Sequence, residues 1–349
     1  MGFAASNPII TAISCYFGKH FTKPVRCVAA IVGLVACLAA LICINIDWQM
    51  LQDEMRAIGY QPSAQISSTA DTLKLTRKGK SIFYATHPEF QNSNEFNSTC
   101  GNDGEKRLTL GCYYRDMHNQ EKLYLFDNGI DAINEDGIVF DYSTERSKTA
   151  LHELLHAVYD RYDSSKQKSI CWRLDQVSAK IPSLEETLSR YPEEQRCTES
   201  FARIGSEYIV SLNIKNGASN IESAPISNKD YSIAEQAAIS DLTNEYRKYF
   251  ELNYSLSRLH WKNQNQVTYI SEQLDQEHTQ ITTENRRIKT MVADYYRTPT
   301  HAKLNRVNAA IKKYNEKVRS YRKLQKIYSK ICDSMDSEKI ASVGSINNL

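Results

Sequence analysis

The sequence lacks several features that would assign a function class at once. Its formal net charge at pH 7 is only +2 over 349 residues, so the overall charge indicates no particular class of partner. It contains nine cysteines, but no two of them are spaced C-x-x-C, and a cysteine-ligated zinc site therefore has no support. The function has to be sought in local motifs.

One long apolar run lies near the N-terminus. Residues 27–46 carry no charged side chain, and a helix of this length spans a hydrocarbon core of about 30 Å. The preceding residues 1–26 are basic, whereas Asp47 and Asp53 follow the run. By the positive-inside rule we expect a single-pass membrane protein with a cytoplasmic N-terminus and the rest of the chain outside the cytoplasm. A cleaved signal peptide or a lipoprotein signal is the alternative, and a secreted or delivered effector stays open.

Export would permit disulfide bonds among the cysteines that follow this run. We predict that Cys100 pairs with Cys112 and that Cys171 pairs with Cys197, which leaves Cys332 over. The second pair would hold the segment just before a candidate metal ligand described below.

The segment from His152 to His156 reads H-E-x-x-H. On a helix, residues i and i+4 share a face, so His152 and His156 can bind one metal ion. Glu153 then lies beside the metal, where it can take a proton from water. The alternative, non-functional interpretation is an amphipathic core helix with two incidental histidines.

The context of the motif favours a metal site. Residues 137–142 have the alternating, β-branched character of a strand. Ser143 or Thr144 can cap the helix that follows, with Glu145 in its first turn. Apolar residues then recur at helical spacing and predict a buried face: Ala150, Leu151, Leu154, Ala157 and Val158.

A catalytic zinc site needs a third protein ligand. Tyr159 and Tyr162 occupy the positions of the Gly and the third His in H-E-x-x-H-x-x-G-x-x-H, which excludes a metzincin. Glu199 opens an apolar helical pattern downstream and is the preferred ligand, with Glu207 on the same helix as the alternative. Asp160, one turn past the motif, is a candidate for orienting a ligand histidine.

H-E-x-x-H followed about forty residues later by Glu199-Ser200-Phe201-Ala202 resembles the anthrax lethal factor type of zinc metallopeptidase, which includes the Pro-Pro endopeptidases. The resemblance covers roughly residues 120–210. Leu155 departs from it, because many such enzymes carry Gly before the second His, and this puts the tightness of helix packing in question.

The resemblance implies a gluzincin-type active site with one zinc ion. The ligands would be His152, His156 and Glu199, with Glu153 as general base. The family also places a Tyr shortly before the ligand glutamate to stabilise the oxyanion, and Tyr191 stands in a similar position.

Strand-like segments precede the motif and predict a small sheet. They are separated by Asn, Asp and Gly clusters and comprise residues 72–76, 81–84, 108–110 and 122–126. We expect residues 137–142 to be the edge strand that holds an extended substrate by main-chain pairing.

The C-terminal third predicts an antiparallel helical hairpin. Apolar residues follow a 3-4 heptad rhythm on both sides of a break at residues 298–300. The second helix is strongly basic, which would suit nucleic acid or an anionic membrane. We favour a solvated face opposite an acidic first helix and expect no nucleic-acid partner, although a partner or self-association through the hairpin is possible.

These observations predict an α+β protein in which a small sheet, an active-site helix and a helical lobe form a zincin-like domain. The expected divisions are a leader (1–26), a transmembrane helix (27–46), a linker (47–70), a metallopeptidase domain (71–225), a helical hairpin (226–335) and a tail (336–349). The predicted function is a zinc-dependent endopeptidase acting on a protein or peptide. The alternative is a non-enzymatic, membrane-anchored coiled-coil interaction protein with an incidental H-E-x-x-H.

Overall fold

The computed structural model describes residues 47–100, 110–118, 120–127, 129–214 and 231–332. The chain divides into two compact units, residues 1–52 and 53–349, and helix α3 (Trp48–Arg56) crosses their boundary. The leader, the expected transmembrane helix and the tail lie outside the described residues. Within the described part, no helix is long and apolar enough to cross a membrane.

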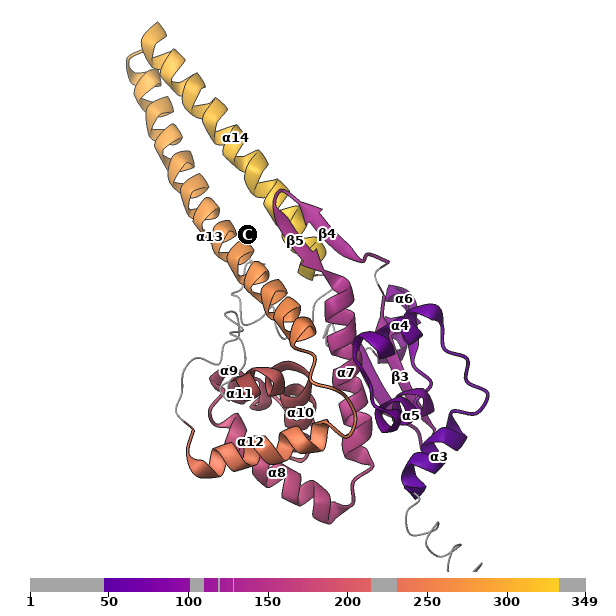
Figure 1. Ribbon diagram of the computed structural model, residues 1–349. Helices are drawn as coiled ribbons and strands as arrows, with labels where there is room; N and C mark the ends of the chain where they lie inside the picture. Colours follow the sequence, from indigo (N-terminus) through magenta and orange to yellow (C-terminus); the bar gives the residue numbers. More distant parts are fainter. Residues whose placement is uncertain (1–46, 101–109, 119, 128, 215–230, 333–349) are drawn as a thin grey trace, which may run out of the picture. The chain divides into compact units, whose positions relative to one another are not determined.

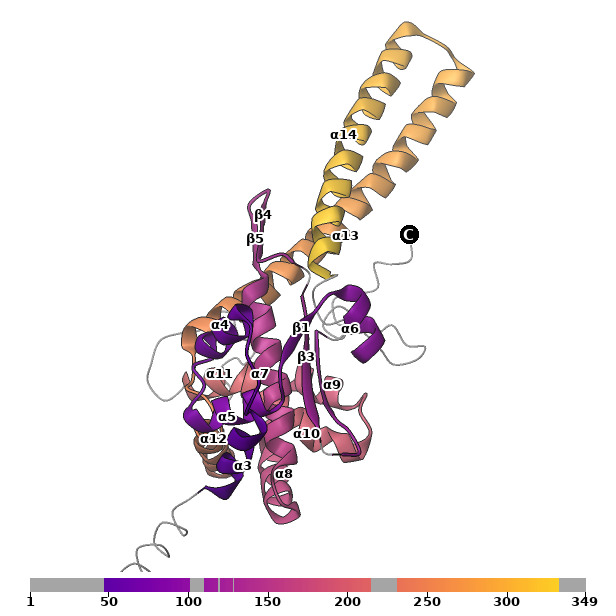
Figure 2. The same ribbon diagram turned by 90° about the vertical axis from the view of Figure 1, so that its right-hand side faces the viewer.

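The described part of the second unit is α+β, mostly helical with two small sheets (Figures 1 and 2). In the first sheet the order is β1 (Glu89–Gln91), β3 (Glu121–Phe126) and β2 (Gly111–Arg115). β1 runs parallel and β2 antiparallel to β3. Strand β2 is therefore an edge strand of this sheet among the described residues. The expected strand at residues 122–126 is confirmed as part of β3.

The second sheet is a two-stranded hairpin of β4 (Ala132–Glu135) and β5 (Ile138–Asp141). Its two turn residues, Asp136 and Gly137, both have positive φ, 54° and 79°. This is the backbone that an Asp-Gly turn adopts between twisted antiparallel strands. The strand predicted at residues 137–142 is confirmed as β5, whereas β4 was not expected.

Helix α7 (Tyr142–Asp160) follows β5 directly and carries H-E-x-x-H. Its N-cap is Asp141, whose side chain accepts hydrogen bonds from the backbone N–H groups of Ser143 and Thr144. The prediction that Ser143 or Thr144 caps the helix was thus wrong by two or three residues, because a carboxylate at residue 141 satisfies the same donors. The five apolar residues expected to form the buried face of α7 are all buried.

Helix α7 lies between two layers of the second unit, as Figure 1 shows. The first sheet and the helices α4 (Ala64–Thr72) and α5 (Arg77–Ala85) lie on one side. A helical lobe lies on the other, formed by α8 (Ser164–Ser178), α9 (Pro182–Leu188), α10 (Glu193–Arg203), the π-helix η1 (Ile204–Tyr208), α11 (Ile209–Ile214) and α12 (Ile233–Tyr246). One hydrophobic core joins the layers through α7.

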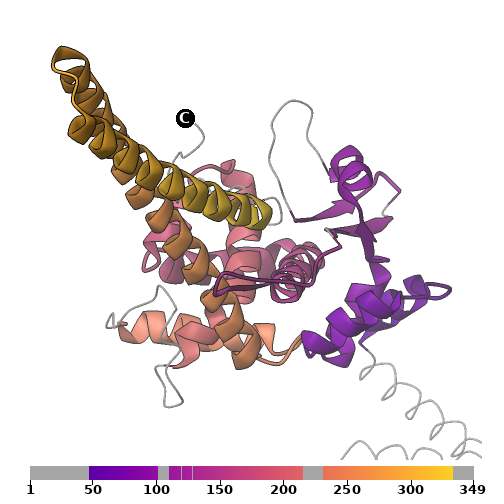
Figure 3. The same ribbon diagram turned by 90° about the horizontal axis from the view of Figure 1, so that it is seen from above.

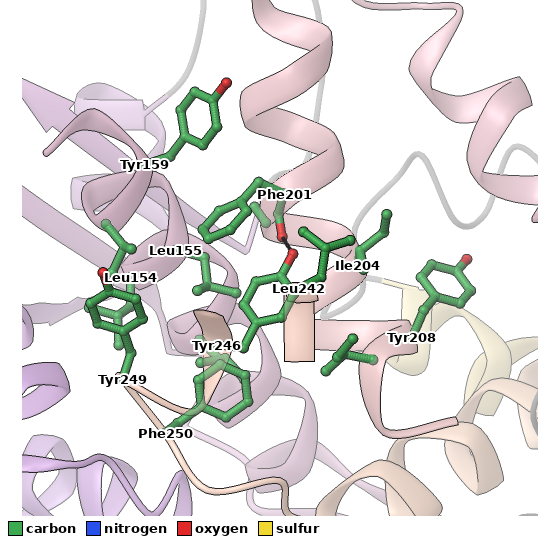
Figure 4. Packing of buried hydrophobic residues seen from close by; sticks show 14 of the residues in the cluster. Leu154, Leu155, Tyr159, Phe201, Ile204, Tyr208, Leu242, Tyr246, Tyr249 and Phe250 are labelled. Carbon is green, nitrogen blue, oxygen red and sulfur yellow. Dashed lines mark hydrogen bonds between the residues drawn. The ribbon is translucent and has the colours of Figure 1, made fainter. Parts of the chain in front are cut away.

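The helical lobe is fixed by aromatic packing around Tyr246 of α12 (Figure 4). Its ring lies 4.7 Å from that of Phe201 on α10, centroid to centroid, and its hydroxyl donates a 2.8 Å hydrogen bond to the Phe201 carbonyl. Tyr246 is fully buried, and a buried hydroxyl left without a partner costs about 1–3 kcal/mol, so this bond ties α12 to the helix that carries Glu199.

Two of the predicted strands are wrong. Residues 81–84 lie inside α5, which begins at the N-cap Thr76 and buries Ile82 and Phe83. Of residues 72–76, only Leu75 forms an isolated bridge, to Phe250. Residues 108 and 109 lie outside the described part. A short apolar run does not distinguish a strand from a buried helix. In residues 81–84, packing against distant segments of the core stabilises the helix.

The segment expected as a linker, residues 47–70, contains α3 and most of α4. Ile66 and Ala70 of α4 are fully buried in the core. The Ser63 hydroxyl caps this helix by accepting from the Ile66 N–H. Polar surface residues on α4 gave the segment a linker-like composition although its inner face packs.

The helical hairpin consists of α13 (Tyr254–Arg297) and α14 (His301–Cys332) (Figures 1 and 3). Residues of both helices form a second core with the β4–β5 hairpin, among them Val267, Ile270, Ile327 and Ile331. The antiparallel pairing and the break at residues 298–300 are confirmed. The hairpin begins later than residue 226, because α12 packs in the helical lobe and the hairpin starts at Tyr254.

Both predicted disulfides are confirmed. Cys100–Cys112 joins the end of α6 (Ser93–Cys100) to β2, and Cys171–Cys197 joins α8 to α10. Cys332, expected to be left over, belongs to neither.

Candidate metal centre and cleft

The H-E-x-x-H histidines face one another on α7. The Nε2 atoms of His152 and His156 are 3.1 Å apart, as the i, i+4 relation on a helix predicts. Both side chains are partly exposed at the surface of a cleft. The buried face of α7, which includes Leu154 and Ala157, turns these two imidazoles outward from the core.

Glu199 of α10 meets the two histidines. Its Oε1 lies 3.7 Å from His152 Nε2 and its Oε2 lies 3.4 Å from His156 Nε2. The residue is only 5% exposed. Two anchors place this part of α10: the Cys171–Cys197 disulfide and a 2.9 Å hydrogen bond between the buried hydroxyls of Ser178 and Ser200.

The spacing of these three donors fits a zinc ion. Ligand atoms about 2.0–2.1 Å from zinc at tetrahedral angles lie about 3.3 Å from one another. The observed separations of 3.1, 3.4 and 3.7 Å bracket that value. Two imidazole nitrogens and one carboxylate are also a donor set that zinc prefers, and three protein ligands leave a fourth position open.

The electrostatics favour an ionised carboxylate at Glu199. Burial raises its pKa, but His152, His156 and Arg203 outweigh this and hold the pKa well below its ordinary range. Burial of His152 lowers its pKa. The negative charges of Glu199 and Glu153 raise the pKa by more than burial lowers it, so the net shift is upward. The ionised carboxylate favours a positive charge beside it, and this charge could be a protonated His152, the Arg203 guanidinium or a metal ion.

Arg203 links the candidate ligand to its surroundings. Its Nε donates to Glu199 Oε1, its Nη1 lies 3.6 Å from Glu207 Oε1, and its Nη2 donates to Tyr191 Oη at 3.5 Å. Glu207, the alternative ligand, is thus paired with this guanidinium, and the cluster of potential metal donors contains Glu199 instead. The π-helix η1 that carries Glu207 follows directly after Arg203.

The three candidate ligands open onto a cleft of about 440 Å³, a size typical of small-ligand and peptide sites. Glu153 and Tyr191, the expected base and oxyanion donor, line the same cleft. Glu153 is 8% exposed. The structure therefore brings together all five site residues that the sequence singled out.

The strand at the cleft differs from the predicted one. Leu110 and the first three residues of β2, 111–113, line it, whereas β5 pairs with β4 and packs against the helical hairpin. The expectation that residues 137–142 form the edge strand at the site was wrong, because the chain turns into α7 before β5 can join the first sheet. Asp160 lies 3.7 Å from Arg115 Nη1, and this ion pair is its contact at the cleft.

The structure explains the unusual Leu155. This side chain is fully buried, and a Cβ added to Gly205 of η1 would lie 2.5 Å from Leu155 Cδ1. The small residue that lets α7 and η1 approach at this point is Gly205. Sequence reasoning missed Gly205, Arg203 and Gly111, since each acts through contacts between distant segments.

No family model, curated protein or solved structure matches this chain. The functional conclusion therefore depends on the geometry of the cleft.

Proposed function

We propose that this chain is a zinc-dependent endopeptidase of the gluzincin type, with His152, His156 and Glu199 as ligands of one zinc ion. The observation that carries the proposal is the separation of the three donors, 3.1, 3.4 and 3.7 Å, in a cleft that also contains Glu153. An edge strand, an H-E-x-x-H helix and a glutamate-bearing helix around one cleft also support a zincin-like fold.

When bound, zinc supplies a Lewis acid that makes water acidic near neutral pH and polarises the scissile carbonyl. Glu153 accepts the proton of the attacking water and then passes it to the leaving amine. Tyr191 donates to the oxygen on which negative charge develops, a contribution typically worth about 3 kcal/mol. Arg203 donates to the Tyr191 oxygen, a bond in which the phenolic oxygen accepts and which does not use the phenolic proton.

An extended protein or peptide segment is the substrate that fits this site. The edge strand β2 offers main-chain groups along one wall, and an extended peptide can add to such an edge by β-augmentation. Other lining residues are Glu194 and Thr198 of α10 and Tyr191 just before that helix.

Two disulfides beside the cleft support a location outside the reducing cytoplasm. Together with the apolar residues 27–46, they support a membrane-anchored enzyme whose catalytic domain is extracytoplasmic. Protease accessibility of the C-terminal part in intact cells tests this orientation.

The central test uses a fragment beginning at Trp48. We expect it to bind about one zinc ion and to cleave members of a peptide library, with loss of cleavage on chelation. Glu153→Gln keeps the metal and abolishes cleavage. Undiminished cleavage by that variant would falsify the assignment of Glu153.

The choice of third ligand is tested by two matched substitutions. Glu199→Gln should weaken zinc binding strongly, whereas Glu207→Gln, which removes a neighbouring partner of Arg203, should leave the stoichiometry at one ion. The opposite pattern would transfer the ligand role to Glu207.

One observation favours a second function. Glu199 already has a cationic partner in Arg203, so the cluster can be neutralised without a metal, and the long α13–α14 hairpin then becomes the functional element of a non-enzymatic interaction protein. Absence of stoichiometric zinc in the purified chain would favour this alternative.

A further inference from the structure

Gly111, the first residue of β2, lies buried against α7. A Cβ added to it would lie 2.7 Å from Thr149 Cγ2, 2.8 Å from Glu153 Cγ and 3.2 Å from Glu153 Oε1. Its φ is not positive, so the backbone conformation does not require glycine here. The requirement is space, and the space is taken by the side chain of the proposed general base.

The strand has little freedom to retreat from α7. Gly111 pairs with Leu125 and Cys112 pairs with Tyr124 in the register of β2 with β3. The Cys100–Cys112 disulfide also holds the next residue. Any added atom at residue 111 must therefore displace a side chain of α7 in preference to the strand.

The two α7 side chains respond differently. Thr149 is β-branched and restricted at χ1, whereas Glu153 is unbranched at Cβ and can rotate about its Cα–Cβ bond. Its Cγ is the atom in conflict, and a rotation about that bond that moves Cγ away also moves the carboxylate at the end of the side chain. Glu153 is the side chain that gives way.

We propose that Gly111 is a positioning residue for Glu153: the absence of a side chain on the edge strand seats the glutamate at the position from which it serves as base. The proposal deepens the proposed function and depends on it for its kinetic consequences. Gly111 itself contacts neither metal nor scissile bond in this role, and it acts through the glutamate alone.

The kinetic expectation for Gly111→Ala is a selective loss of turnover. Misplacement of a catalytic group by about 1 Å costs about 100-fold in rate, so kcat should fall by about that factor. KM should change by less than about threefold and the zinc stoichiometry should stay at one ion, because the ligands come from other residues. An equal fall in zinc content and kcat would overturn the positioning role.

Gly205→Ala is the matched control. It makes the same change at a comparably crowded glycine, where the added Cβ would lie 2.5 Å from Leu155 Cδ1. Residue 205, however, faces the core and not Glu153. It should lower the unfolding temperature and leave kcat of the folded, zinc-loaded protein within about threefold. If both variants lose kcat alike, the effect at residue 111 is general crowding and the proposal is wrong.

A second variant tests the steric argument itself. Thr149→Ser removes Cγ2, the other atom that the added Cβ would meet, but leaves the 2.8 Å conflict with Glu153 Cγ. Compared with Thr149→Ser alone, the Gly111→Ala/Thr149→Ser double variant should therefore still lose most of the kcat that Gly111→Ala loses from the wild type. Full recovery of kcat in the double variant would show that the added methyl acts through Thr149, and it would overturn the proposal.

Crystal structures decide the matter independently of activity. In Gly111→Ala the Glu153 side chain should adopt a different rotamer while β2 keeps its register with β3. A retreat of β2 with Glu153 unmoved overturns the proposal. If the wild-type chain cleaves no peptide, the proposed function fails, and this structural outcome still tests what Gly111 does.

Discussion

The cleft region and the α13–α14 hairpin are held together by contrasting kinds of contact. Around the cleft, the decisive contacts join residues far apart in the sequence, as in the hydrogen bond from Tyr246 to Phe201 and the packing of Leu155 on Gly205. Along the hairpin, apolar residues repeat at heptad spacing and meet between two neighbouring helices. A local sequence pattern therefore specifies the hairpin, whereas contacts between distant segments form the cleft.

The two regions meet at the start of α7. Asn263 of α13 donates to the Asp141 carbonyl at 2.8 Å and to Glu145 Oε1 at 2.9 Å. His260 Nδ1 lies 3.0 Å from Glu145 Oε2, and Tyr142 donates to the Lys330 carbonyl of α14. The base of the hairpin is thereby joined to the helix that carries the histidines. The cleft region and the hairpin therefore differ in the kind of contact that holds each together, but they are not separate modules.

The largest effect that separates the regions is expected from the Cys171–Cys197 disulfide. Replacing both residues by Ser opens a loop with a sequence separation of 26, and the chain-entropy relation gives a loss of about 3.5 kcal/mol in the free energy of unfolding. Zinc affinity should fall as well, because Glu199 lies two residues beyond Cys197. Denaturant unfolding and chelator competition measure the two effects.

Val307→Ala is the control in the hairpin. This buried residue of α14 should cost about 1 kcal/mol and leave zinc affinity unchanged. A loss of zinc affinity equal to that of the cysteine variant would mean that the ligands depend on the hairpin as much as on the helical lobe.

The same contrast explains how much could be predicted from sequence. The heptads gave the hairpin, and helical spacing gave the buried face of α7 and the facing histidines, since these are local periodicities. The Asp136-Gly137 turn was a recognisable hairpin signal, so β4 could have been found beside β5.

Other elements depended on tertiary contacts that no local pattern contains. Residues 81–84 are strand-like in composition, yet they form a helix because Phe83 packs in the core below α7. The cleft strand was misplaced for the same reason: nothing near Gly111 in the sequence shows that Glu153 lies against it.

A second prediction tests whether Gly205 makes room for Leu155. Gly205→Ala should lower the free energy of unfolding by about 2 kcal/mol through overpacking. In a Leu155→Ala background the same change should cost about 1 kcal/mol less, since directly contacting residues couple. A double-mutant cycle by urea unfolding measures this. Additivity would show that Tyr246, which also crowds Gly205, accounts for the whole cost.

The third prediction concerns pH and is smaller. Glu245 of α12 is buried, which raises its pKa, but Lys166, Lys248 and Tyr162 lower it below its ordinary value of 4.5. A depressed pKa adds stability above 4.5, and this stability is lost as the pH falls through the folded-state pKa. Glu245→Gln should therefore cost about 1–2 kcal/mol at pH 7, with the difference from wild type vanishing in acid. A constant difference at all pH values would contradict the linkage.

The smallest effect is expected on the outer face of α14. Arg319 is exposed, and its Nε donates a 3.3 Å hydrogen bond to the Asn315 carbonyl one turn earlier. Arg319→Gln should change the free energy of unfolding by less than about 0.5 kcal/mol.

The sequence favoured a basic face balanced by an acidic α13, yet Lys303 with Asp294 is the ion pair between the two helices that the described residues show. If charge balance along the hairpin nevertheless stabilised it, Arg319→Glu would destabilise clearly more than Arg319→Gln at low salt, and added salt would erase the difference. Equal unfolding curves would show that packing between heptads is sufficient to hold the hairpin.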